Sequence, residues 1–177
     1  MERIKLFVVL GLLVFLVAGC ARGEQPSWGT SGSIVITLTM RGDVDSSVKY
    51  FVALDTDGNV LTGPGDDPAE WSGFYVLRWA EGNFYFQNRS GEEQFFSGGS
   101  VSGATIKMEV NLSDLGKPST LEVMVATTDR GGNVLDALGN YFTVRLNSQS
   151  YVYREETSSD TSNAAGDIRK VEIEVRR

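Results

Sequence analysis

The sequence contains no histidine and only one cysteine, Cys20. Without histidine, the chain lacks the commonest general base, the commonest metal ligand and every nucleophile–histidine catalytic pair. A single cysteine cannot close a disulfide within the chain, so an exported domain with this sequence depends on its core for stability. These absences exclude thiol–histidine catalysis and metal sites built from histidine or several cysteines. We therefore expect a protein that is not an enzyme.

Long apolar runs are also scarce, and the one present lies at the start of the chain. Residues 6–17 form this run, and Arg3 and Lys5 precede it. A transmembrane helix needs about 20 predominantly apolar residues, so the run is too short to be one. A basic start, a short apolar segment and small residues before a cleavage point are typical of a secretory signal.

The four residues that end this segment are Val17-Ala18-Gly19-Cys20. They resemble the lipobox of bacterial lipoproteins. The resemblance implies cleavage before Cys20 and lipid on its sulfur, with residues 1–19 as signal peptide and residues 20–32 as a lipidated, flexible tether. An ordinary signal peptide, cut elsewhere and leaving Cys20 free, is the alternative.

The mature chain is acidic. Removing residues 1–19 leaves 158 residues with 14 basic and 22 acidic side chains, a net charge of -8. This charge argues against nucleic acid as a partner and against charge-driven adhesion to anionic lipid. We therefore expect lipid on Cys20 to attach the protein to a membrane, at the extracytoplasmic face of the cell membrane or at the outer membrane. Ala21, in place of an inner-membrane retention aspartate, favours an outer surface in a cell with two membranes.

Residues 33–177 alternate between apolar and polar side chains almost throughout, which predicts strands with one buried face. The clearest alternation runs over residues 34–40, 48–54, 106–112 and 168–175. Further strands are predicted at 73–80, 84–88, 94–97, 121–128, 141–146 and 151–155. No helical stripe of any length is present. We expect one all-β domain, an antiparallel β-sandwich (jelly-roll or immunoglobulin-like) of about nine or ten strands, with a closed barrel as the alternative.

Turn chemistry adds three local predictions. Asp57-Gly58 suits a two-residue type I′ hairpin, which places Leu54 opposite Leu61 on the buried face. Gly82-Asn83 serves the same purpose between two aromatic strands. Residues 157–166 are small and polar, and predict a mobile loop before the last strand.

The segment Asp55-Thr56-Asp57-Gly58-Asn59 carries the best candidate metal ligands. Calcium takes six to eight oxygen ligands, and alternating acidic side chains in a loop can supply several of them. The spacing is not that of an EF-hand. We therefore predict Asp55, Asp57 and Asn59 as calcium ligands, with a plain turn bearing solvated acids as the alternative. Calcium is the one cofactor that the sequence suggests.

Aromatic side chains gather between residues 71 and 86. Along the strand at 73–80 both faces are largely apolar, so one face fills the core and the other is either exposed or covered. Exposed flat aromatics can stack on the apolar face of a sugar. We predict a ligand-binding platform of Trp71, Tyr75, Trp79 and Tyr85. The alternative is that residues 63–72 fold over the second face and bury it.

Three turn-rich segments resemble parts of carbohydrate-binding module family 9 and related DOMON-like β-sandwiches. They are residues 50–63, with Asp-Thr-Asp-Gly-Asn and Thr-Gly; residues 107–116, ending in Leu-Ser-Asp-Leu-Gly; and residues 129–136. The resemblance implies a two-sheet sandwich that binds ligands, often sugars, with bound calcium in some members. It also implies a pair of tryptophans at the sugar, for which Trp71 and Trp79 are the nearby pair. Haem, which some members bind, lacks an axial histidine here.

The sequence thus predicts a non-catalytic, membrane-anchored, extracytoplasmic binding module with carbohydrate as its expected ligand. The alternative is a structural or assembly lipoprotein of the cell envelope. Such a protein would contact another envelope protein through a sheet edge, for which the alternating strand at 168–176 is the candidate. Solvent exposure of Trp71, Tyr75 and Trp79 discriminates between the two, because a stacking platform requires exposed rings. If all three are buried, the stacking site is lost and the assembly role is favoured.

Overall fold

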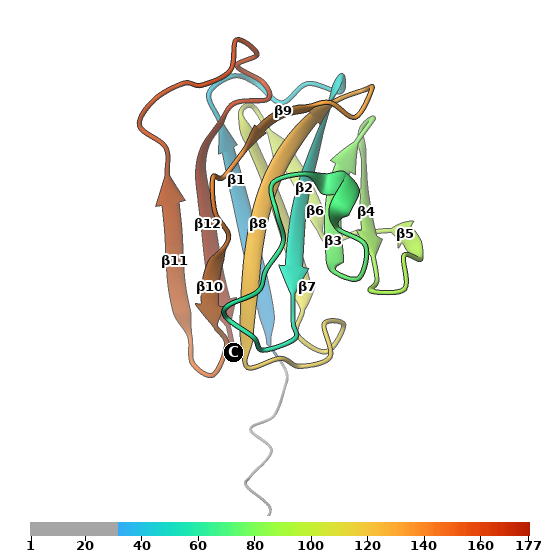
Figure 1. The fold of residues 1–177 in the computed structure, drawn as a ribbon, viewed down its shortest axis with the longest axis vertical. Helices are drawn as coiled ribbons and strands as arrows, with labels where there is room; N and C mark the ends of the chain where they lie inside the picture. Colours follow the sequence, from blue (N-terminus) through green and yellow to red (C-terminus); the bar gives the residue numbers. More distant parts are fainter. Residues whose placement is uncertain (1–31) are drawn as a thin grey trace, which may run out of the picture.

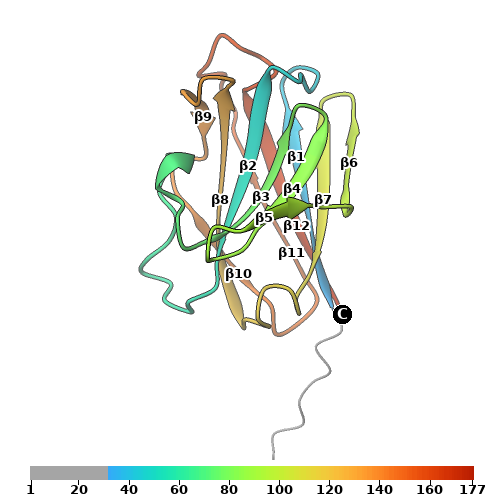
Figure 2. The same ribbon diagram turned by 90° about the vertical axis from the view of Figure 1, so that its right-hand side faces the viewer.

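Residues 32–177, the part of the chain that the computed structural model describes, fold into two antiparallel sheets packed face to face (Figures 1 and 2). The signal segment, Cys20 and most of the tether lie outside these residues. The strands are β1 (Ser33–Met40), β2 (Val48–Asp55), β3 (Tyr75–Ala80), β4 (Asn83–Gln87), β5 (Glu93–Phe95), β6 (Gly99–Ser102), β7 (Thr105–Asn111), β8 (Thr120–Asp129), β9 (Val134–Ala137), β10 (Phe142–Arg145), β11 (Ser150–Glu155) and β12 (Ile168–Arg176). One short 3-10 helix, η2, spans Pro68–Glu70. No helix within residues 32–177 is long and apolar enough to cross a membrane.

Sheet A has five strands in the order β11-β12-β1-β7-β6, and sheet B has seven, in the order β10-β8-β2-β3-β4-β5 with β9 paired to β8. The predicted antiparallel β-sandwich is confirmed, with twelve strands in place of nine or ten. The two strands absent from the prediction are β6 and β9. Both are only four residues long, and β6 has the sequence Gly-Ser-Val-Ser, which carries almost no apolar signal.

The core fills the space between the sheets with the inward side chains of each strand. Ile36 on the central strand of sheet A is fully buried, opposite Met108 of β7 on one side and Ile173 of β12 on the other. Tyr50, Val52 and other inward residues of β2 do the same for sheet B. Burying one such aliphatic side chain stabilises the fold by about 1.5–3 kcal/mol, so the alternation along the strands is what holds the sheets together.

The β3–β4 hairpin confirms the predicted turn between two aromatic strands. Trp79 lies opposite Phe84, and the two-residue turn is Glu81-Gly82, one position earlier than predicted. Glu81 has φ of 52° and Gly82 has φ of 81°, and a type I′ turn requires positive φ at both positions.

The predicted hairpin at Asp57-Gly58 is wrong. Strand β2 already has β8 on one side and β3 on the other, and Leu54 lies opposite Tyr75. A hairpin partner at residues 59–62 therefore has no free edge to join, and Leu61 is 85% exposed. Only Gly58 has positive φ here, so the local backbone does not form a type I′ turn either.

The connection between β2 and β3, residues 56–74, instead crosses the outer face of sheet B, on the side away from sheet A (Figure 2). Its anchor is Trp71, which is 2% exposed and packs edge-on against Phe51, with 6.4 Å between ring centroids. The Trp71 indole Nε1 donates a hydrogen bond to the Gly65 carbonyl at 2.8 Å. The structure thus agrees with the alternative in which residues 63–72 cover the face of strand 73–80 that is turned away from the core.

Sheet edges also differ from expectation. Strand β12 lies between β11 and β1, so residues 168–176 do not form an edge; β11 does.

The loop that precedes β12 is bonded to Arg41, whose guanidinium donates to the carbonyls of Glu156 and Ser158, both at 2.8 Å. These contacts bond the start of the loop to Arg41, and the mobility predicted for residues 157–166 stays a prediction.

Candidate functional site

The four aromatic side chains predicted as a platform do not share an exposed surface. Trp71 lies under the covering segment, and Trp79, 6% exposed, faces the core, where its ring meets that of Tyr50 at 5.4 Å. Tyr75 is half-buried and stacks on Phe86 inside the sandwich. The reason is the strand period, because Tyr75 and Trp79 alternate with residues on the outer face. The structure therefore does not present these rings for sugar stacking.

Of the three members of the predicted set that lie in strands, Tyr85 alone is on the outer face, and its ring has a neighbour on each side. The sheet register places Arg78 of β3 and Phe95 of β5 on either side of it. The Arg78 guanidinium lies 4.5 Å from the Tyr85 ring centroid, and the Phe95 ring stacks at 5.3 Å. Arg78 also pairs with Glu93 at 2.7 Å. Tyr85 thus packs between Arg78 and Phe95 and does not form part of an open platform.

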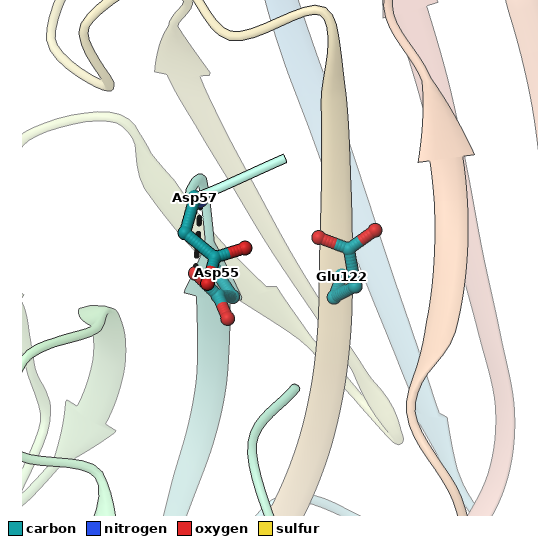
Figure 3. Close-up of side chains that lie close together, drawn as sticks. All are labelled: Asp55, Asp57 and Glu122. Atoms are coloured by element: carbon teal, nitrogen blue, oxygen red, sulfur yellow. Dashed lines mark hydrogen bonds between the residues drawn. The ribbon is translucent and has the colours of Figure 1, made fainter. Parts of the chain in front are cut away.

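Three carboxylates meet at one end of the outer face of sheet B (Figure 3). Asp55, the last residue of β2, lies directly opposite Glu122 of β8. Asp57 follows two residues later, at the start of the covering segment. One oxygen from each of the three lies within 4.8 Å of the others. The structure thus brings Asp55 and Asp57 together, as predicted, and adds Glu122.

The side chain of Asn59, the third predicted ligand, forms its hydrogen bond within its own loop. Its side-chain oxygen accepts a hydrogen bond from the Leu61 amide at 3.2 Å. The Asp57 carboxylate caps the same loop, accepting from the Asn59 amide at 2.6 Å. Asp55 in turn accepts from the Asp57 amide at 3.0 Å. Consecutive turns of this kind are a common use of Asp and Asn side chains, and they account for the sequence pattern without Asn59 as a ligand.

Glu122 has the most unusual environment of the three acids. Its side chain is fully buried, and neither carboxylate oxygen has a hydrogen-bond partner. Burial raises the pKa of Glu122, and the neighbouring carboxylates of Asp55 and Asp57 raise it further. The Thr143 hydroxyl, opposite Glu122 on β10, opposes the rise in part, although its geometry does not meet that of a hydrogen bond. A sequence signal for this residue does exist: Glu122 is the one charged residue in an otherwise apolar or hydroxylic stretch, residues 121–128.

A second acidic group lies at the opposite end of the sandwich and is differently built. Asp136, Asp160 and Asp167 approach one another there. Asp167 is paired with Arg41 at 3.0 Å and also accepts from the Ser159 hydroxyl. Asp136 accepts from the Ile168 amide at 2.6 Å. The two buried carboxylates of this group therefore have protein partners, whereas Glu122 has none.

The outer face of sheet A carries two exposed tyrosines that sequence reasoning did not single out. Tyr151 and Tyr153, both on the edge strand β11, are 55% and 60% exposed, with 6.2 Å between ring centroids. The Tyr151 hydroxyl donates to the Glu172 carboxylate, and Lys170 Nζ lies 5.2 Å from the Tyr153 ring centroid. Lys170 and Glu172 pair with each other at 2.9 Å. We call these four residues the tyrosine face; its signal in the sequence is the alternation Tyr-x-Tyr.

A scan against protein-family models and searches among curated proteins and solved structures each return no match. The likeness to carbohydrate-binding module family 9 therefore stays a prediction from short motifs. The lipidation of Cys20, which lies outside the described residues, stays a prediction from the lipobox.

Proposed function

We propose that this chain is a non-catalytic binding module that lipid on Cys20 holds at a membrane, outside the cytoplasm. We propose further that the module binds carbohydrate through the tyrosine face. Burial of Trp71 and Trp79 removes the platform that the sequence predicted, so the proposal rests on a different surface. The observation that carries it is the pair of half-exposed tyrosine rings, Tyr151 and Tyr153, on the solvent-facing side of sheet A. Aromatic side chains combine a large apolar surface with a polar edge, which suits a partner that is itself part apolar and part hydroxylated. A sugar ring is such a partner.

The polar groups beside the rings support this assignment. Lys170 offers N–H donors and Glu172 offers carboxylate acceptors, and both lie next to the rings on the neighbouring strand. Sugar hydroxyls can both donate and accept, so such mixed groups can hydrogen-bond a sugar that stacks on Tyr151 or Tyr153. Because the groups are carried by two paired strands of a sheet, they are held in place before ligand binds.

The position of the face is compatible with a membrane anchor. Ser33, where β1 begins, lies opposite Arg176 near the end of β12, so the tether joins the sandwich at one end. Strands β11 and β12, which carry the tyrosine face, run along the side of the sandwich (Figure 1). A tether covering positions 20–32 can reach at most about 40 Å, which is long enough to hold the side of the domain clear of the membrane surface.

The test is binding to a glycan array, followed by calorimetric titration of the glycans that bind. We expect Tyr151→Ala and Tyr153→Ala each to weaken binding by about 5-fold or more, because stacked aromatic rings contribute on the order of 1 kcal/mol or more. Phe95→Ala is the matched control, since Phe95 is an exposed ring on the other sheet, at 77% against 55% and 60% for the two tyrosines. Absence of binding to every glycan class, with and without calcium, would contradict the proposal.

A second candidate function is assembly with another envelope protein, and strand β11 favours it. Strand β11 is an edge of sheet A, paired with β12 on one side only, and an edge strand of six residues can accept a strand from a partner. Purification of the anchored protein from detergent extracts distinguishes the two. A stoichiometric envelope protein that co-purifies, in a protein that binds no glycan, would favour assembly.

A further inference from the structure

Glu122 is the one carboxylate within residues 32–177 that is fully buried with neither oxygen partnered. Burying a polar group without a hydrogen bond costs free energy, and burying an unpaired charge costs much more. Native proteins rarely carry such a group without a reason, such as a bound ion. A group that could balance Glu122 is therefore expected next to it.

The surroundings of Glu122 supply further negative charge instead of a counter-charge. Asp55 is 3% exposed and lies opposite it, and Asp57 completes the group. No lysine or arginine in the described part of the chain forms an ion pair with any of the three. Three carboxylates with ligand oxygens within 4.8 Å and no protein cation leave the site short of positive charge.

We propose that Asp55, Asp57 and Glu122 bind a divalent cation, with calcium as the ion that fits best, and that this ion fastens the covering segment at residues 56–74 to sheet B. Each of the three residues comes from a different structural unit: Asp55 from the end of β2, Glu122 from β8, and Asp57 from the covering segment. Binding one ion to all three joins those units.

Ligand chemistry favours calcium over other divalent ions. All three side chains offer oxygen, the donor preferred by calcium and magnesium, and the chain has no histidine or described cysteine for zinc or copper. Calcium tolerates irregular arrangements of carboxylates and completes its shell with water or backbone carbonyls. Asp57 is exposed, so the site is open to solvent on one side and an ion can enter there. Magnesium needs near-octahedral geometry and gives up its water reluctantly.

The acidic group at the other end of the sandwich shows why an acidic cluster alone is insufficient. Asp167 there is balanced by Arg41, and Asp136 by a backbone amide. No described carboxylate in that group is left buried and unpartnered, so it needs no ion. That group therefore supplies the control position for the experiment, the exposed Asp160.

The experiment is thermal unfolding of the full chain in detergent, stripped with EDTA and then titrated with calcium chloride or magnesium chloride. We expect a saturable rise in the unfolding temperature with calcium and a smaller one with magnesium. Ligand that binds only the folded state stabilises it by about 2.7 kcal/mol at 100 times its dissociation constant. Calorimetric titration of the stripped protein should give one calcium bound per chain.

Two variants assign the effect to this site. Glu122→Gln keeps the side-chain shape and removes the buried charge, so without metal it should be at least as stable as the stripped parent, yet lose the response to calcium. Asp57→Asn, an exposed position, should weaken calcium binding by about 10-fold or more, since carboxylate charge sets affinity at such sites. Asp160→Asn should leave the response unchanged.

Two results would overturn the inference. One is a parent protein whose unfolding temperature does not respond to millimolar calcium. The other is a response that survives in both Glu122→Gln and Asp57→Asn, which would place the ion elsewhere. If Glu122→Gln does not fold, Asp57→Asn decides alone. These measurements contain no glycan, so a failure of the calcium proposal can be distinguished from a failure of the carbohydrate proposal.

Discussion

At the residue scale, carboxylates on this acidic chain behave according to what lies around them. Glu156, at the end of the sandwich away from the tether, sits beside Asp136, Asp160 and Asp167. Burial raises the pKa of Glu156 from 4.5 to about 7, those three carboxylates add to the rise, and Arg41 opposes it. A side chain of this kind makes the free energy of unfolding depend on pH near neutrality.

The sign of this dependence follows from where the proton is held. Between pH 4.5 and about 7, the folded state keeps the Glu156 proton that the unfolded state has lost. The contribution of Glu156 to stability is therefore full below pH 4.5 and is lost as the pH rises through about 7. We expect Glu156→Gln to raise the free energy of unfolding at pH 8 by on the order of 1 kcal/mol, after allowance for solvent screening, with a smaller gain at pH 5.

Urea denaturation of both proteins at the two pH values measures this gain. The comparison is made between variant and parent at each pH, so titration of groups distant from Glu156 largely cancels. Glu155→Gln, an exposed neighbour, is the control and should show no comparable gain at pH 8. An equal effect of Glu156→Gln at pH 5 and pH 8 would contradict the assignment.

At the scale of elements, the covering segment at residues 56–74 decides what the outer face of sheet B can do. Alternation predicted strands β2 and β3 correctly, because one face of each must meet the core. It could not predict that β2 is flanked by β3 and β8, since strand order depends on pairings between distant parts of the chain. The Asp57-Gly58 hairpin failed for that reason, and the turn at Glu81-Gly82 succeeded because both of its strands are adjacent in sequence.

The covering segment should contribute measurably to stability through Trp71. We expect Trp71→Ala to lower the free energy of unfolding by about 3 kcal/mol or more, because it empties a buried position and removes the contact with Phe51. Phe95→Ala, at a ring that is 77% exposed, should cost well under that amount. Equilibrium unfolding in urea measures both. A cost for Trp71→Ala no larger than that of Phe95→Ala would mean that the segment adds little to the fold.

At the scale of the whole molecule, the sequence predicted the sandwich but not the arrangement of its candidate sites. The apolar period of two is local information and carries over directly to the two-layer core. The group of Asp55, Asp57 and Glu122 depends on the register between β2 and β8, which turn patterns near Asp55 do not encode. The tyrosine face likewise depends on β11 pairing with β12 so that Lys170 and Glu172 lie beside the rings.

The whole molecule also depends on how the sandwich is held at a membrane, and Cys20 carries that prediction. With residues 1–19 removed, the chain would have a net charge of -8, so an anionic lipid surface would repel it, and lipid on Cys20 would supply the attachment that charge cannot. Stable anchoring takes more than one acyl chain, and the lipoprotein family meets that need with several chains on one cysteine.

We expect Cys20→Ser to move most of the protein from the membrane fraction to the soluble or unprocessed fraction. Ser27→Ala, a change in the tether, should leave the protein with the membrane. Cell fractionation measures the shift, and intact mass of the detergent-extracted parent should show acyl chains at Cys20. A parent of unmodified mass, or a Cys20→Ser protein that is cleaved and still held at the membrane, would contradict the anchor and leave Cys20 as a free thiol on an ordinary secreted sandwich.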